Sequence, residues 1–136
     1  MQGWDVMMGP DLAARPGAAG VNSVAFSPEG RALAAAGGEP GRPGGVILWD
    51  VDTRTPRVVL RGHTQEVSSV LFSADGGTLA TASPDGTVRL WDPDTAAARS
   101  ALAPGIGALR AVAFSPDGLT LVAAGTAGTI AVVDTE

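Results

Sequence analysis

Apolar residues along this chain fall into short runs that alternate with turn residues. In the middle of the chain the runs are Val67–Phe72, Leu79–Ser83 and Val88–Trp91, and glycine, proline, serine and aspartate separate them. Short apolar runs bounded by such residues predict β-strands. The second run consists of small residues, which favours a central strand covered on both faces. The Ser-x-Asp/Glu-Gly sequence after the first run suits a tight hairpin.

This succession of strands occurs three times. Phe26, Phe72 and Phe114 mark three aligned segments and lie 46 and 42 residues apart. A second series, ending in VILWD, VRLWD and AVVDT, follows the first in the same order. A fourth, weaker strand is predicted at Arg57–Arg61 and Arg99–Ala103. A period of about forty residues built this way predicts one four-stranded antiparallel sheet per repeat.

The predicted fold class is therefore all-β, with three four-stranded antiparallel sheets in one domain over residues 1–136. The repeats cover about 6–50, 51–92 and 93–136. At the start, Trp4 and Asp5 look like the end of a third strand, and a fourth strand is predicted near Leu12–Arg15. Ile130–Asp134 is a third strand with no fourth after it.

The middle repeat also carries a specific signature. The stretch GHTQEVSSVLFSADGGTLATASPDGTVRLWD, residues 62–92, closely resembles the WD-repeat family of β-propellers, with Gly-His at its start, Asp-Gly in its second hairpin and Trp-Asp at its end. The resemblance is strongest here and looser in the outer repeats. It implies that each sheet is a propeller blade. Because propellers close with roughly four to eight blades, we expect three blades to complete a larger ring by oligomerisation.

The resemblance also implies roles for polar residues of the middle repeat. In such a blade a His, a Ser or Thr of the second strand, the Asp of the second hairpin and the Trp indole form a hydrogen-bonded chain. The matching residues are His63, Thr81 or Ser83 on the same strand face, Asp85 and Trp91. Repeat one has Gly17 for the His, and repeat three has Gly105, Ala127 and Val133 for the His, Asp and Trp. The Trp-Asp positions at the ends of the repeats are Trp4, Asp5, Trp49, Asp50, Trp91, Asp92 and, without the Trp, Asp134.

Each polar feature has a second interpretation. His63 and Asp85 could be a catalytic base and its orienting acid, but no activated nucleophile motif accompanies them, and the resemblance makes them structural. The run GGEPGRPGGV lacks the Lys-Ser/Thr of a phosphate-binding loop and has two prolines, so we interpret it as a lengthened hairpin tip. Metal binding is a possible role for the acidic residues of the first hairpins, but their identical positions indicate turn formers; they are Glu29, Asp75 and Asp117. We predict no catalytic, cofactor or metal site.

Composition and charge narrow the classes of partner. The net charge is −5, and the nine cationic residues are all arginines that do not cluster, so nucleic acid is not expected as a partner. No apolar run approaches the length of a membrane span, and the N-terminus does not have the pattern of a secretory signal, so we expect no membrane partner and a cytoplasmic protein. The absence of cysteine excludes disulfides and thiolate chemistry.

Three functions follow from this reasoning. The first is a non-catalytic scaffold that presents one propeller face to protein or peptide partners. The second is an enzyme or small-molecule binder that uses the central channel, where Asn22, Ser68 and Arg110 occupy one equivalent position. The third is a fragment or an engineered self-assembling module without separate activity. In the assembly we favour, the segment Val6–Arg15 completes the last blade of another copy head to tail, giving six blades as a dimer or nine as a trimer, with the dimer preferred.

Overall fold

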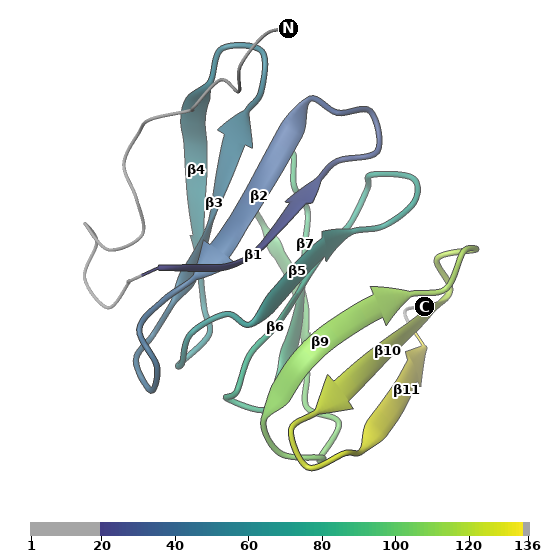
Figure 1. Cartoon of the computed structure of the whole chain (residues 1–136). Coiled ribbons are helices and arrows are strands. Elements are labelled where there is room, and N and C mark those ends of the chain that lie inside the picture. The colour runs from purple at the N-terminus through teal and green to yellow at the C-terminus, as the bar shows by residue number, and fades with distance from the viewer. Residues whose placement is uncertain (1–19, 135–136) are drawn as a thin grey trace, which may run out of the picture.

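The computed structural model describes residues 20–134, and these residues form eleven β-strands in three antiparallel sheets (Figure 1). The first sheet has the order β1-β2-β3-β4, the second β5-β6-β7-β8 and the third β9-β10-β11. The strands are β1 (Val21–Phe26), β2 (Ala32–Gly37), β3 (Gly45–Asp50), β4 (Thr55–Arg61), β5 (Ser69–Phe72), β6 (Leu79–Ala82), β7 (Val88–Trp91), β8 (Ala98–Leu102), β9 (Leu109–Phe114), β10 (Thr120–Gly125) and β11 (Ile130–Asp134). The predicted all-β class with three antiparallel sheets is confirmed.

The third sheet differs from the four-stranded sheet that its repeat predicts. Among residues 20–134 it contains three strands, with β11 as its outer strand. This agrees with the interpretation of Ile130–Asp134 as a third strand. The predicted strand at Leu12–Arg15 and the segment Val6–Arg15 lie outside the described residues.

The hairpins between the first two strands of each sheet share one construction. In the second sheet, Ser73 and Thr78 close the turn with a backbone hydrogen bond of 2.8 Å, and Gly76 takes a positive φ of 76°. The Asp75 carboxylate accepts hydrogen bonds from the Ser73 hydroxyl and the Gly77 amide, at 2.7 and 2.9 Å. These bonds satisfy the turn locally, which explains why the Ser-x-Asp/Glu-Gly sequence recurs.

The three sheets lie side by side, and their innermost strands β1, β5 and β9 are neighbours in that order (Figure 1). Successive side chains of a strand point to opposite faces of its sheet, so each middle strand contributes side chains to the packing on both faces. Val46 and Leu48 of the first sheet pack against Leu79 and Trp91 of the second. A second buried cluster joins the second and third sheets through Val88, Leu90, Leu109, Leu121 and Ala123. A third, smaller buried cluster, formed by Ile47 and Trp49, lies on the other side of the first sheet. The core therefore consists of two layers between the three sheets and this outer cluster.

The long connection between β2 and β3 is closed at its base by backbone contacts with the start of the second repeat. Gly44 donates its amide to the Gln65 carbonyl at 2.9 Å, and Val67 donates to the Gly37 carbonyl at 3.2 Å. A methyl group on Gly44 would lie against the Gly37 carbonyl oxygen and 2.7 Å from the Glu66 Cα. Residues 39–43 of the tip are exposed, whereas the base is buried. The base therefore anchors the first sheet to the second.

We expect Gly44→Ala to lower the free energy of unfolding by about 1–3 kcal/mol, because the atoms it meets are backbone and cannot move aside cheaply. Chemical denaturation at fixed protein concentration measures this. Gly62→Ala is the matched control: the nearest atoms there belong to the flexible end of Arg89, at 3.1 Å, so its change stays within about 0.5 kcal/mol. Equal stability of the two variants would remove the anchoring role of the base.

Candidate functional site

A chain of polar side chains crosses the second sheet. The His63 Nε2 atom lies 2.7 Å from the Thr81 hydroxyl, and the Trp91 indole N–H donates to the same hydroxyl at 3.1 Å. On its other side, His63 Nδ1 lies 3.0 Å from an Asp85 carboxylate oxygen. His63 and Trp91 are 4% exposed and Thr81 is fully buried. The arrangement links the turn before β7 to the packed interior of the sheet.

The hydrogen bonds among His63, Thr81, Asp85 and Trp91 fit one consistent placement of their protons. If Thr81 accepts from the Trp91 indole, its own O–H donates to His63 Nε2, and His63 Nδ1–H donates to Asp85. Burial lowers the pKa of His63, and this outweighs the opposing attraction of Asp85. Burial acts to raise the pKa of Asp85, but hydrogen bonds from Thr87 and the Thr64 amide hold it below its usual value. With a neutral imidazole beside an ionised carboxylate, every polar group of this network has a hydrogen-bond partner.

Thr87 is a member of this network that the sequence analysis missed. Its hydroxyl donates to Asp85 and lies 3.1 Å from His63 Nδ1. Its amide also donates to Asp85, at 2.9 Å. The signal was present, since an Asp two residues before a Thr at a hairpin turn is typical of an Asx turn. Ser83 is buried but separate from the imidazole, and its hydroxyl accepts a hydrogen bond from the Asp85 amide at 3.1 Å.

The pH dependence of stability tests the protonation of His63, the single histidine of the chain. Its folded pKa lies below its ordinary value of 6.5, so the unfolded chain binds a proton more readily. The contribution of neutral, buried His63 to the free energy of unfolding is complete above pH 6.5 and decreases as the pH falls below that value. We expect the free energy of unfolding to fall between pH 7.5 and pH 5, and His63→Gln to remove this slope in denaturant titrations. An unchanged slope in the variant would assign it to other groups.

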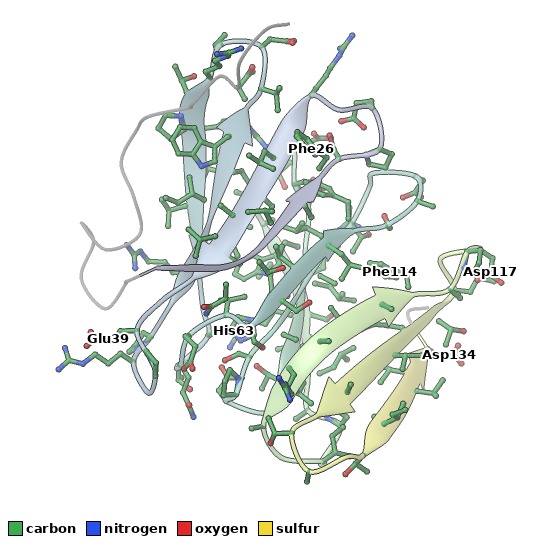
Figure 2. The ribbon with its side chains drawn as sticks, in the orientation of Figure 1. Phe26, Glu39, His63, Phe114, Asp117 and Asp134 are labelled. Carbon is green, nitrogen blue, oxygen red and sulfur yellow. The ribbon has the colours of Figure 1, made fainter. Side chains whose placement is uncertain are left out.

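The remaining Trp-Asp positions lie at the ends of strands. Trp49 and Asp50 end β3, Asp92 follows β7, and Asp134 ends β11. Asp50 and Asp92 accept hydrogen bonds from amides of the turn that follows, Thr53 in the first sheet and both Asp94 and Thr95 in the second. Trp4 and Asp5 lie outside the described residues. Figure 2 shows His63 at the same end of the sheets as Glu39, and Phe26 and Asp117 toward the other end.

The side of the first sheet that faces away from the second sheet is apolar. Phe26, Leu33 and Trp49 lie opposite one another in register, as do Val24, Ala35 and Ile47. We call this set the first outer face. Val24 and Phe26 of β1 are 61% and 63% exposed, whereas Ile47 and Trp49 of β3 are buried, at 1% and 8%. The exposed part of this face therefore lies on β1.

The side of the third sheet that faces away from the second sheet is also apolar. Val122 lies opposite Val132, and Ala124 lies opposite Ile130. Ile130 and Val132 are 65% and 69% exposed. We call this set, with Ala111 and Ala113 of β9, the third outer face. Contiguous exposed apolar residues of this kind mark interaction surfaces.

Metal ligands and membrane spans are the remaining features to describe in the part of the chain that the structure covers. Residues 20–134 contain no group of three or more His, Asp or Glu side chains placed to hold a metal ion. Each acidic residue of the first hairpins lies in its own turn: Asp75 and Asp117 both bond the preceding Ser hydroxyl and a turn amide. No helix among these residues is long and apolar enough to cross a membrane.

Comparison with known protein families also finds three repeats in this chain. The family model of the WD domain, G-beta repeat, matches residues 12–50, 54–92 and 105–134. The chain belongs to the WD40 family. Its three sheets are accordingly WD40 blades, and the resemblance noted for residues 62–92 is confirmed.

Individual WD40 relatives are similar over part of the chain. The target of rapamycin complex subunit wat1 of Schizosaccharomyces pombe is 42% identical over 71 residues, which cover 51% of this chain and 21% of the relative. Autophagy-related protein 18 of Scheffersomyces stipitis is 33% identical over 69 residues, covering 51% of this chain and 11% of the relative. Apoptotic protease-activating factor 1 of Rattus norvegicus is 46% identical over 44 residues, covering 32% and 4%. The matched parts thus span less than a quarter of each relative.

Proposed function

We propose that this chain is a non-catalytic WD40 scaffold that binds protein partners, and that its blades assemble into a ring by pairing the first outer face of one copy with the third outer face of another. WD40 proteins typically bind other proteins, and one relative is named as a subunit of a complex. The observation that carries the proposal is that the two outer faces repeat, at most of their positions, the two faces already packed together inside the chain.

The first outer face repeats the face by which the second blade packs on the first. In the second blade, Phe72, Leu79 and Trp91 occupy this layer. The first outer face has the same residues at three equivalent positions, Phe26, Leu33 and Trp49. It differs at Ala35 and Ile47, where the second blade has Thr81 and Arg89. A face of this composition is therefore suited to packing on the far side of another blade.

The third outer face repeats the surface that receives such a layer. In the first blade that surface is formed by Ala34, Ala36, Val46 and Leu48, all buried. In the second it is formed by Ala80, Ala82, Val88 and Leu90. The equivalent residues of the third outer face, small on the second strand or branched and apolar, are Val122, Ala124, Ile130 and Val132.

The hydrogen bonds between neighbouring blades are also repeated at equivalent positions. The Asn22 side chain donates to the Val67 carbonyl at 3.1 Å, and the equivalent Ser68 hydroxyl donates to the Leu109 carbonyl at 2.8 Å. The equivalent residue of the third blade is Arg110, an exposed donor. We expect it to reach the Val21 carbonyl of another copy. These positions thus serve contacts between blades, which supports a scaffold in preference to a catalytic channel.

The number of blades favours a dimer. Two copies give six blades, within the usual range of roughly four to eight, whereas three copies give nine. A head-to-tail contact forms a closed ring only when the rotation per blade fits; otherwise open chains grow. The two outer faces could instead be covered by further blades of a longer protein, and the experiment below distinguishes this case.

Disulfide trapping tests the assembly, because the chain has no cysteine of its own. Inside the chain, the Val70 amide lies 3.2 Å from the Ser23 hydroxyl. The equivalent pair between copies is Ala111 of one and Val24 of the next. We expect Ala111→Cys with Val24→Cys to form intermolecular disulfides and closed dimers in non-reducing denaturing gels.

The control for this experiment is Ser23→Cys with Val70→Cys, which places cysteines at the same relative positions within one chain. We expect it to form an intrachain disulfide. If this control is oxidised while the Ala111 and Val24 pair leaves the chain monomeric, self-assembly through the outer faces is wrong, although the WD40 fold stands.

A further inference from the structure

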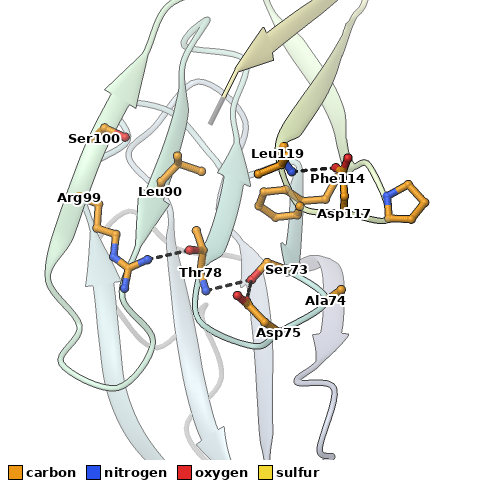
Figure 3. A pocket seen from close by; sticks show the side chains of 12 residues that line it. Ser73, Ala74, Asp75, Thr78, Leu90, Arg99, Ser100, Phe114, Asp117 and Leu119 are labelled. Atoms are coloured by element: carbon orange, nitrogen blue, oxygen red, sulfur yellow. Dashed lines mark hydrogen bonds between the residues drawn. The ribbon is translucent and has the colours of Figure 1, made fainter. Parts of the chain in front are cut away.

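A pocket of about 530 Å³ lies between the second and third blades (Figure 3). Asp117, which lines it, lies toward the end of the sheets opposite His63 (Figure 2). Its apolar wall is formed by Leu90, Phe114 and Leu119, and Leu119 is 45% exposed. Arg99 and Thr78 line one side, and the hairpin carboxylates Asp75 and Asp117 line the opening. Pockets of 300–1,000 Å³ with an apolar wall and a few convergent polar groups are the size and kind that bind ligands. All of these residues belong to one chain, so the pocket does not depend on self-assembly.

The two carboxylates are held in place and keep one oxygen free. In both Asp75 and Asp117 the Oδ1 atom accepts from a Ser hydroxyl, at 2.7 and 2.6 Å, and from a turn amide at 2.9 Å. The Oδ2 atom of each accepts no hydrogen bond from the described residues. The Ser hydroxyl is the main cause that lowers the pKa of each, so both are ionised at neutral pH. The opening thus carries two oriented negative charges.

Arg99 is the one cation among the described residues that line the pocket, and its charge is a minor cause of the lowered pKa of Asp75, with which it forms no ion pair. The Arg99 guanidinium forms an ion pair with Asp92 at 3.1 Å and donates to the Thr78 hydroxyl at 2.7 Å. Arg99 therefore pairs directly with Asp92, and the lining residues Asp75, Asp117 and Arg99 leave the pocket net negative. Neither Asp75 nor Asp117 has an ion pair with a residue of the described part.

The equivalent arginine of the first blade shows what such a side chain can bind. Arg57, 42 residues before Arg99, donates its two terminal nitrogens to the backbone carbonyls of Pro93 and Asp94 in a turn of the second blade. Between the first and second blades, this arginine therefore binds backbone carbonyls. Between the second and third blades, Arg99 occupies the position equivalent to Arg57. It lines the pocket, and part of its side chain is exposed.

We propose that this pocket binds a peptide segment of a partner protein through a lysine or arginine of that segment. The aliphatic stem of the basic side chain lies on Leu90 and Phe114, its cationic head lies between the free oxygens of Asp75 and Asp117, and Arg99 donates to a peptide carbonyl beside it. A cation next to an aromatic ring adds a favourable interaction with Phe114. The inference extends the proposed scaffold function by giving the chemistry of one partner.

The test uses the acetylated and amidated pentapeptide Gly-Ala-Arg-Ala-Gly, added to the full chain labelled with ¹⁵N. We expect chemical-shift changes at the amides of Gly77 and Leu119, which donate to the two carboxylates. The same peptide with Gln in place of Arg should bind clearly more weakly. Equal binding of the two peptides, no response, or a response confined to amides outside the pocket would each overturn the proposal.

Matched variants locate the interaction. Asp75→Asn and Asp117→Asn retain the Oδ1 acceptor of the turn, and we expect each to weaken binding of the Arg peptide about two- to five-fold. Glu29→Gln, at the same hairpin position in the first blade, removes a charge that lies beside the Gly76 turn but outside this pocket, and should weaken binding clearly less than either of these variants. A loss of affinity in Glu29→Gln as large as that in the other two variants would show general attraction to an acidic surface and would contradict a specific site. Arg99→Gln should weaken both peptides alike, because it acts on the backbone.

Discussion

Trp91→Ala is expected to lower the free energy of unfolding by about 3–5 kcal/mol, the usual range for removing a buried aromatic side chain. Trp91 is 4% exposed and packs in the layer between the first and second blades. The substitution leaves a cavity in that layer and also removes the indole donor to Thr81. Chemical denaturation at one fixed protein concentration gives the change, since any self-association makes stability depend on concentration.

Trp91→Phe separates packing from hydrogen bonding. It keeps most of the buried ring but loses the N–H, so we expect a cost of about 1 kcal/mol beyond the small change in volume. Combining it with Thr81→Val in a double-mutant cycle measures the coupling of the pair. If Trp91→Phe costs as much as Trp91→Ala, the packing argument fails; if the cycle shows no coupling, the hydrogen bond has no energetic role.

Phe26→Asp and Val132→Asp are each expected to abolish self-assembly and to leave folded monomers. Both side chains are more than 60% exposed in the single chain, so a charge there costs the isolated fold little. In a ring the same charge would be buried against an apolar face without a partner, which costs several kcal/mol. Size-exclusion chromatography with light scattering reports the mass, and circular dichroism reports the fold.

Leu119→Asp is the matched control for these two variants. Leu119 is also an exposed apolar residue, 45% accessible, but it lies in a hairpin away from both outer faces. We expect it to keep the mass of the unmodified protein. If Phe26→Asp and Val132→Asp also keep that mass, neither outer face takes part in assembly.

The strands of the second blade could be predicted closely from the sequence. The predicted strand Val88–Trp91 coincides with β7, and Leu79–Ser83 exceeds β6 by one residue. The prediction worked because turn residues end these strands abruptly and the buried run between them is uninterrupted. Val67–Phe72 exceeds β5 by two residues, because Val67 and Ser68 bond the adjacent blade and the end of β6 rather than extend the ladder.

Contacts between repeats could not be predicted in the same way. Asn22, Ser68 and Arg110 differ so much in type that their equivalence suggested no role, yet two of them donate to equivalent carbonyls across the blade interfaces. The role of Arg57 could not be predicted either. Its partners are backbone carbonyls, which every residue has, so the residue types do not indicate the contact. Polar residues within one repeat are visible to pattern analysis, whereas donors to a neighbouring repeat are recognised only when the repeats are placed side by side.

The mass of the unmodified chain in solution, measured by multi-angle light scattering over a hundredfold range of concentration, tests the account most directly. We predict a single species at twice the 13.5 kDa mass of the chain, constant over the range because a closed ring leaves no free face for growth. A constant threefold mass would keep the ring and change its blade number. A monomer throughout, or a mass that rises steadily with concentration, would contradict a closed ring formed by the two outer faces.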